Sequence, residues 1–420
     1  MALSTTSASE SMQQEQSAQQ SNKPKQPQHK RDRLITRDMA LVMLATFCFM
    51  SSNMLANPIV AGYAESLGAS GMLMGVVAGS MSFISLFCRP IAGNLSDRTS
   101  KRTLVAAGTV LYFAAGLLYY FADSPIMLIM ARVINGVGFA CCSVCLATWM
   151  SLLLPIRHMG AGMGLYGTMN ALAMAVGPAF GIRAQKYIGY RLTFLSSLVL
   201  AAIMLIATLM VKNGGQPVRK KQTSISATKK HRFSIRSILE PRVVPLSLTF
   251  MMFAIAYFAN QSFIVSYVQS RHLPVSSDLF FMFYAVALLV LRLGLRDLFD
   301  SKGFRFWLTV CSLGMLAMLA CMTFLFNDWM LLLAAIFTAV GYGLMSSVTQ
   351  AQAVVIAGRE RSGIANSTYY AGIDLGMSVG PFVGGLVYGH LPAVWFYPVF
   401  MLAMPVAWLI YLLCVKRVSR

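Results

Sequence analysis

Charged residues are scarce in this chain. Asp, Glu, Lys and Arg make up 11% of its 420 residues, whereas hydrophobic residues make up 57%. A water-soluble domain carries about 25% charged residues, so the composition excludes an ordinary soluble fold. We therefore expect the lipid bilayer to be the solvent, and we predict an all-α polytopic membrane protein.

The sequence also lacks the signatures of several enzyme classes. The phosphate-binding pattern G-x-x-x-x-G-K-[ST] is absent, so we expect no ATP hydrolysis by this chain. We find no catalytic triad and no metal-ligand cluster, and the eight cysteines lie mostly inside apolar runs, where they serve as small packing residues. We predict that the protein is not an enzyme and uses no cofactor or metal.

The net charge is +20, but the bases are not gathered as on a nucleic-acid-binding face. They collect in the N-terminal tail and in short gaps between apolar runs, which is typical of membrane proteins. Residues 1–38 are rich in Gln, Ser and Lys and cannot bury enough apolar area to order themselves. We expect a disordered tail, and a first apolar run that is too long for a signal peptide and is retained.

Apolar runs long enough to cross a bilayer occur about twelve times. The predicted spans are 39–62, 71–93, 103–122, 125–150, 159–183, 191–211, 243–268, 277–295, 305–326, 329–352, 363–388 and 393–415. The breaks between them are short except for one basic linker. The sequence therefore predicts an N-terminal tail (1–38), a six-helix bundle (39–211), the linker (212–242), a second six-helix bundle (243–415) and a C-terminus (416–420).

The bases lie mainly in every second break of this pattern. Arg98, Arg157, Arg296 and Arg359 lie in such breaks, whereas the fifth break is an exception that contains Lys186. An excess of Lys and Arg marks the cytoplasmic side of a membrane protein. We therefore expect both termini in the cytoplasm and a multi-pass protein of the cell membrane.

The two halves of the sequence resemble each other at a fixed offset of 203 positions. The matching pairs are Asn57 and Asn260, Arg89 and Arg292, Asp97 and Asp300, Arg102 and Arg305, and Gly177-Pro178 and Gly380-Pro381. An offset shared by pairs across most of the chain predicts two similar bundles related by an axis along the membrane normal. Transporters use this plan, with a polar cavity between the bundles.

Three motifs make the chain resemble the major facilitator superfamily over nearly all of 39–415. "GNLSDRTSKR" is similar to the family's signature between its second and third helices, with Ser100 where Gly is usual. "RVINGVGFA" is similar to the fourth-helix motif and contains Arg132 and Gly136. The fifth-helix motif of the antiporter branches is matched at Gly164, Gly177, Pro178 and Gly181, with Ala173 and Ile182 departing from it. The resemblance implies the drug:H+ antiporter-like efflux branch.

The charged segment at 93–102 lies between two apolar runs and carries charges of both signs. Contacts of such a segment with a neighbouring helix can close the cytoplasmic side and must break when the bundles rock apart. The alternative is a solvated loop whose bases only fix the topology. The predicted gating residues are Gly93, Asp97, Arg98, Lys101, Arg102, Asp300 and Arg305.

Two charged residues fall well inside predicted spans. Arg132 lies within 125–150, and an intramembrane Arg is a functional candidate by default; the resemblance implies a part in proton coupling or substrate contact. Asp374 lies within 363–388, and the protonation of such a carboxylate depends on its burial and on nearby cations. We predict both as proton-coupling residues. The alternatives are an interfacial anchor for Arg132 and a carboxylate satisfied by local hydroxyls or amides for Asp374.

Polar and aromatic side chains in several spans could line a central pocket. The predicted substrate-binding residues are Asn53, Asn57, Asn170, Asn260, Gln261, Tyr369 and Tyr370. The first span has no acid near its middle, and Glu65 lies at its end as an expected interface residue. That absence weakens the case for cationic drugs as substrates.

Three functions remain open at this point. The first is a proton-coupled exporter of a small amphipathic compound that works by alternating access. The second is an importer of a sugar, organic anion or other nutrient, and the third is a transporter-like sensor that docks partners through the basic linker. The expected partners are a small-molecule substrate, protons and the bilayer, with no nucleic acid, and the resemblance implies that a monomer can work alone.

Overall fold

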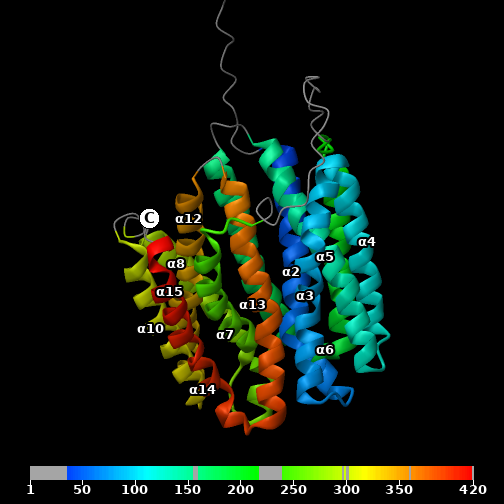
Figure 1. Cartoon of the computed structure of the whole chain (residues 1–420). Coiled ribbons are helices and arrows are strands. Elements are labelled where there is room, and N and C mark those ends of the chain that lie inside the picture. Colours follow the sequence, from blue (N-terminus) through cyan, green and yellow to red (C-terminus); the bar gives the residue numbers. More distant parts are fainter. Residues whose placement is uncertain are drawn as a thin grey trace, which may run out of the picture. The chain divides into compact units, whose positions relative to one another are not determined.

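The structure is a computed structural model that describes residues 36–154, 159–216, 239–295, 298, 302–358 and 361–418. Residues 37–420 form one compact unit. Every regular element in the described part of that unit is a helix, which confirms the all-α prediction (Figure 1). Residues 1–35 of the predicted tail, most of the predicted linker and Asp300 lie outside the described residues, and the first helix begins at Arg37, inside the predicted tail.

The first half of the unit consists of five assigned helices. They are α2 (Arg37–Ser66), α3 (Gly71–Arg98), α4 (Lys101–Tyr120), α5 (Pro125–Leu153) and α6 (Met159–Met210). Side chains fix where two of them begin, because the hydroxyls of Ser70 and Ser124 accept hydrogen bonds from backbone N–H groups three residues later. Pro125 follows directly as the first residue of α5, a position that needs no N–H donor.

Helix α6 contains the two spans that the sequence predicts as separate helices. Its 52 residues correspond to about 78 Å, more than twice the hydrocarbon thickness of a bilayer. Gly189 interrupts it with φ 77° and ψ 173°. Residues on either side of this glycine contact the same stretch of α2, Gly177 through Ser51 and Ser197 through Ser52. The chain therefore reverses at Gly189 and crosses twice.

The second half begins with α7 (Val244–Ser270), α8 (Ser277–Gly294) and α10 (Phe304–Thr323). The tenth predicted span is divided into α11 (Asp328–Thr338), the π-helical segment η3 (Ala339–Leu344) and α12 (Met345–Ala357). It is followed by α13 (Ser362–His390), η5 (Ala393–Trp395), α14 (Phe396–Met401) and α15 (Ala403–Val418). A π-helical turn inside a helix often occurs at a functional site, because it redirects side chains.

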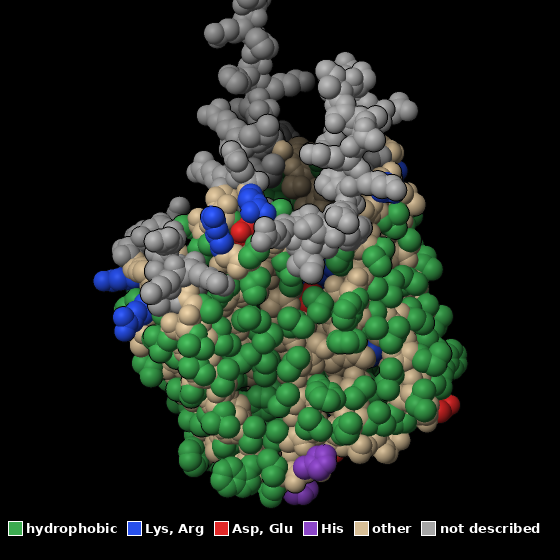
Figure 2. Space-filling view, in the orientation of Figure 1, with side chains coloured by type: hydrophobic (Ala, Val, Ile, Leu, Met, Phe, Trp, Pro, Cys, Tyr) green, Lys and Arg blue, Asp and Glu red, His purple; other side chains and the backbone are tan. Residues whose placement is uncertain are grey.

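Ten segments of the described chain are long and apolar enough to cross a membrane. One of them is the twice-crossing α6, and α8 is not among the ten although its 18 residues span about 27 Å. With these two differences the structure agrees with about twelve predicted crossings. Figure 2 shows apolar side chains over most of the visible side of the helices, as expected for a surface that faces lipid.

The two ends of the helices differ in charge. The basic end contains the start of α2 at Arg37 and the α3–α4 turn, and most Lys and Arg side chains visible in Figure 2 lie toward it. The opposite end contains the turn 67–70 and the end of α13 at His390. That the basic end faces the cytoplasm stays a prediction.

The halves contact each other through three helix pairs, α3 with α13, α2 with α7, and α6 with α8. The α3–α13 contact is closest toward the opposite end, where backbone meets backbone. A Cβ atom added to Gly75 would lie 2.6 Å from the carbonyl oxygen of Pro381, and one added to Gly71 would lie 2.5 Å from Gly389. Nearer the basic end, a Cβ on Gly93 would meet nothing within 4 Å, and Figure 1 shows α3 and α13 diverging there.

Candidate functional site

An ion pair joins the two halves between these diverging helices. Arg89 of α3 donates from Nη2 to Oδ1 of Asp374 in α13 at 3.0 Å, and its Nε also contacts Oδ2. The Asp374 side chain is only 2% exposed, and that of Arg89 is 22% exposed. A planar guanidinium that binds both oxygens of a buried carboxylate fixes the relative position of the two helices.

Aromatic rings from both halves surround the guanidinium. Its carbon lies 5.5 Å from the ring centre of Phe139 in α5 and 6.0 Å from that of Tyr370 in α13. Both distances allow cation–π attraction. Tyr370 therefore lies beside the predicted coupling residue, where a substrate could sense the state of the ion pair.

A stack of aromatic rings continues from this point into the second half. Tyr342 lies in the π-helical segment η3 and stacks on Tyr257 with ring centres 4.0 Å apart and planes 2° apart. Phe250 stacks on Tyr342 and on Tyr369, at 5.5 and 5.4 Å. The hydroxyl of Tyr369 donates to the backbone carbonyl of Ser346 at 2.9 Å. The predicted substrate residue Tyr369 is thus part of a packed aromatic wall.

Arg132 is buried in α5, as the sequence predicts, and its acceptors all belong to the first half. The guanidinium donates to Oδ1 of Asn57 at 3.0 Å and to the backbone carbonyls of Ala78 and Val77 at 2.7 and 3.2 Å. These bonds compensate the cost of burying the charge and tie α5 to α2 and α3. The part of Arg132 in proton coupling stays a prediction.

The predicted substrate amides fall into two groups. Gln261 lies at the α2–α7 contact, where it reaches Met54. Asn53 lies in α2, and both of its amide atoms are buried without a hydrogen-bond partner. The others bond within their own half: Asn57 binds Arg132, and Asn260 accepts from Tyr397 at 2.9 Å.

Asn170 lies in α6 and donates to the backbone carbonyl of Tyr166 at 3.1 Å, while its Oδ1 is buried and unpaired. The structure therefore does not bring all seven predicted residues into one cluster. Gln261 lies at the contact between α2 and α7, and Tyr370 lies beside the Arg89–Asp374 pair with Tyr369 next to it.

Two of the predicted gating residues donate hydrogen bonds within their own half. Lys101 donates to the Ser96 carbonyl, and Arg102 to the carbonyls of Val211 and Lys212. Arg98 is exposed. Arg305 is exposed in α10, and the Asp97 side chain lies outside the described part. Their gating role stays a prediction.

The glycines of the fifth-helix motif face α2. A Cβ on Gly177 would lie 2.8 Å from the Met54 side chain, and Gly181 packs directly against the backbone of Leu55. Pro178 lies between them inside α6. Gly164 lies in the same helix near its start, and its surroundings are outside the described part. Small residues here permit close contact between the first and fifth spans.

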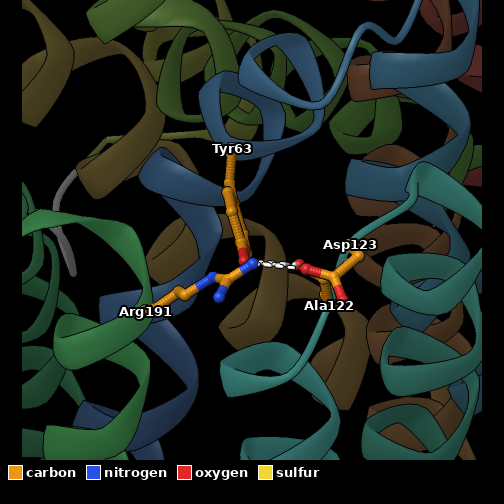
Figure 3. Close-up of polar contacts among 4 residues, drawn as sticks. All are labelled: Tyr63, Ala122, Asp123 and Arg191. Carbon is orange, nitrogen blue, oxygen red and sulfur yellow. Dashed lines mark hydrogen bonds and ion pairs between the residues drawn. The ribbon is translucent and has the colours of Figure 1, made fainter.

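Polar contacts hold the opposite end together. Glu65, predicted as an interface residue, accepts a hydrogen bond from Tyr388 of the other half at 3.1 Å, and Arg183 lies 4.0 Å from Asp278. Within the first half, Arg191 pairs with Asp123 and donates to the Ala122 carbonyl, which also accepts from Tyr63 (Figure 3). The halves are thus joined at this end and linked near the basic end by the Arg89–Asp374 pair.

The sequence missed Arg89 as the partner of Asp374. The structure pairs Arg89 with a residue 285 positions away, and the sequence alone assigns it no partner. The available signal was the 203-position offset, which relates Arg89 to Arg292. It marks both arginines as repeated features but does not say which acid either one meets.

These features define a polytopic helical membrane protein whose two related halves are joined by buried polar contacts, the plan of a transporter. The family model of the Major Facilitator Superfamily matches residues 42–327 and 303–420. The chain belongs to this superfamily, and it is a membrane transporter of that type.

Relatives with similar sequences are distant. An uncharacterized MFS-type transporter of Methanocaldococcus jannaschii is 24% identical over 371 residues, which cover 85% of this chain and 92% of the relative. A synaptic vesicular amine transporter of Homo sapiens is 26% identical over 172 residues, 41% of this chain and 33% of the relative. An SPX domain-containing membrane protein of Arabidopsis thaliana is 32% identical over 169 residues, 39% and 24%. The chain thus spans a third or less of the last two proteins.

Solved structures share the fold at low sequence identity. A POT family transporter in complex with 5-aminolevulinic acid superposes with a TM-score of 0.73 and 11% identity, covering 91% of this chain and 97% of the other. A nucleoside transporter superposes with a TM-score of 0.67 and 13% identity, covering 92% and 100%. These likenesses concern the fold alone.

Proposed function

We propose that this protein is a proton-coupled exporter of a small amphipathic compound, and that Asp374 is the residue that exchanges the proton. The observation that carries the proposal is the Arg89–Asp374 pair, a buried carboxylate whose only ionic partner among the described residues belongs to the other half. The fifth-helix motif at Gly177 and Pro178, typical of antiporters, favours export.

The ion pair supplies the coupling step. A proton on Asp374 removes the negative charge that holds Arg89, so the bond between α3 and α13 weakens. The two helices are already apart at Gly93 and close at Gly75, which leaves the basic end as the place where their spacing can change. Protonation then shifts the balance between two arrangements of the halves, as alternating access requires.

An importer of the same fold is the second candidate. Helix α2 has carboxylates only at Asp38 and Glu65, near its two ends. It therefore offers no acid at mid-membrane that would hold a cationic drug for export. The two candidates differ in the direction of transport under a given proton gradient, and not in the role of Asp374.

Inverted membrane vesicles with an imposed proton gradient test the proposal. A panel of amphipathic compounds is added one at a time, and a pH-sensitive dye reports proton movement. We expect proton release from vesicles with the native protein for at least one compound, and none with Asp374→Asn. Full transport by Asp374→Asn would remove its assigned role.

The matched control is Asp123→Asn. Asp123 also pairs with an arginine, but its side chain is 77% exposed and its partner Arg191 belongs to the same half (Figure 3). We expect this variant to retain proton release. We expect the same of Glu65→Gln, which serves as a second control. Loss of release in all three variants would mean that any missing carboxylate disables the protein, and would contradict a specific role for Asp374.

A further inference from the structure

Arg292 is a charged side chain of the second half that forms no ion pair with the described residues. It lies in the last turn of α8, and its Nε atom is buried without a hydrogen-bond partner. Among the residues that the structure describes, no carboxylate lies within ion-pair distance of it. Arg292 is partly buried, and an unpaired guanidinium N–H is costly inside a membrane protein, which makes this side chain a candidate for ligand binding.

The direction of the side chain argues against a simple interfacial anchor. Arg292 lies within electrostatic range of the hydroxyls of Tyr284, Tyr342 and Tyr369. All three tyrosines are at most 4% exposed and belong to the aromatic wall of the second half. An arginine that reached along α8 toward the membrane surface would lie away from these rings. These interactions, together with the buried Nε atom, indicate that Arg292 lies on the side of α8 that faces the aromatic wall.

The internal repeat relates this place to the Arg89 site. Arg292 is Arg89 shifted by 203 positions, and the ring residues obey the same shift, Phe139 to Tyr342 and Tyr166 to Tyr369. Arg89 lies over Phe139, and Arg292 lies near Tyr342. The helix pairs also correspond, because α6 contacts α8 as α3 contacts α13. Each half therefore provides an arginine in an aromatic pocket.

The two pockets differ in one residue. Asp374, which neutralises Arg89, shifts by 203 positions to Ala171 in α6. The position from which the repeat would supply a carboxylate to Arg292 therefore holds a methyl group. The first pocket contains its own anion, whereas the second has the cation and the rings but no anion.

We propose that Arg292 binds the carboxylate of an amphipathic substrate, with Tyr342 and its neighbours against the apolar part of the same molecule. The inference rests on the proposed transport function and names its substrate class as organic acids. A guanidinium binds a carboxylate with two parallel hydrogen bonds, and the stacked rings of Phe250 and Tyr342 form an apolar wall that a substrate would contact after the wall rearranges. The carboxylate of the substrate then supplies the negative charge that Asp374 supplies to Arg89 and that Ala171 cannot supply to Arg292.

Benzoate, benzamide and benzylamine are probes of one size and three charges. The full-length protein is purified in detergent, and its Tm is measured with each probe over a range of concentrations. We expect benzoate alone to raise the Tm of the native protein. Arg292→Gln weakens this effect at least tenfold, while the exposed control Arg242→Gln retains it. Equal stabilisation by all three probes, no stabilisation by benzoate, or full stabilisation of Arg292→Gln would overturn the proposal.

Ala171→Asp is a second test variant, and its expected effect is a gain of stability. It supplies the missing carboxylate within the chain, so we expect a higher Tm without benzoate and no further rise when benzoate is added. A variant that folds and still responds to benzoate like the native protein would contradict the proposed position. The same measurement in nanodiscs tests a lipid as the source of the anion. If phosphatidylglycerol raises the Tm through Arg292 and benzoate does not compete with it, the anion belongs to a lipid and the proposal is overturned.

The binding assay is independent of proton coupling. If benzoate binds through Arg292 but Asp374→Asn vesicles still release protons, the proposed coupling fails and the anion site stands. If coupling requires Asp374 but benzoate binding ignores Arg292, the anion site fails and the coupling stands.

Discussion

Arg89 and Asp374 lie 285 positions apart in the sequence, yet they form an ion pair that joins the two halves of the molecule. The pair lies on the two helices whose spacing widens from Gly75 toward Gly93. A bond at this place controls a moving contact if the halves rock against each other. Its two partners are also unequal, because Asp374 is almost fully buried and Arg89 is partly exposed.

This inequality predicts different costs for the two single substitutions. Arg89→Gln leaves a buried carboxylate without a partner, and we expect it to lower stability by about 3–5 kcal/mol near neutral pH. Asp374→Asn leaves a partly exposed guanidinium that can reach water, so its cost is smaller. The double variant should be more stable than Arg89→Gln alone. Thermal unfolding in detergent measures all three, and additive effects of the two substitutions would contradict the pairing.

The glycine contact at the opposite end predicts a shift in the balance between conformations. Gly75→Ala places a Cβ 2.6 Å from the Pro381 carbonyl oxygen, so α3 and α13 must separate at that end. We expect a cysteine introduced at the neighbouring exposed position Met72 to become more reactive toward a membrane-impermeant maleimide. The control is Gly167→Ala in α6, where a Cβ meets nothing within 4 Å. Equal labelling in both variants would show that the contact is not tight.

Arg132 and Arg191 provide a comparison between a buried and an exposed arginine of the same half. Arg132→Met removes charged hydrogen bonds to Asn57 and two carbonyls, and we expect a loss of about 2–3 kcal/mol. Arg191→Gln breaks an exposed pair with Asp123, for which about 0–1 kcal/mol is expected (Figure 3). Unfolding temperatures of the two variants give the ranking. The reverse order would contradict a supporting role for Arg132 inside the first half.

A fourth prediction concerns the place where the chain re-enters the second half after the linker. The backbone N–H of Glu240 donates to the hydroxyl of Thr368 at 2.9 Å, and its buried carboxylate lies 2.6 Å from Arg361. Thr368→Val keeps the shape but leaves that N–H unpaired, and we expect a loss of about 1–2 kcal/mol. Thr309→Val removes only a bond from an exposed side chain within its own helix and should be nearly neutral. Similar unfolding temperatures of the two variants would contradict a stabilising role for the Glu240–Thr368 hydrogen bond.

The sequence predicts most of the fold because a bilayer imposes strong rules on composition and length. Runs of about 20 apolar residues locate the helices to within a few positions, and the main difference is that the fifth and sixth predicted spans follow each other directly at the kink of Gly189. The offset of 203 positions predicts two related halves. The π-helical segment around Tyr342 was not predicted, because its hydrogen-bond pattern leaves no trace in composition or periodicity.

The candidate site was predictable only in part. The sequence identifies Arg132 and Asp374 correctly as buried charges, since such residues stand out in apolar runs. It does not tell which helix each one meets, because partners such as Arg89 come from the other half. The predicted amides lie at separate contacts. Because these helices are apolar on almost every side, they have no polar face from which the direction of a given side chain could be predicted.

The distance between α3 and α13 at the basic end, measured as a function of pH, tests the central claim most directly. Spin labels at the exposed positions Arg98 and Ser367, in a protein without its native cysteines, report this distance by pulsed electron paramagnetic resonance. The account predicts that the distance distribution of the otherwise native protein changes with pH. In Asp374→Asn the low-pH distribution should persist at every pH. A pH-dependent change that is the same in Asp374→Asn would contradict the claim that protonation of Asp374 governs the contact between the halves.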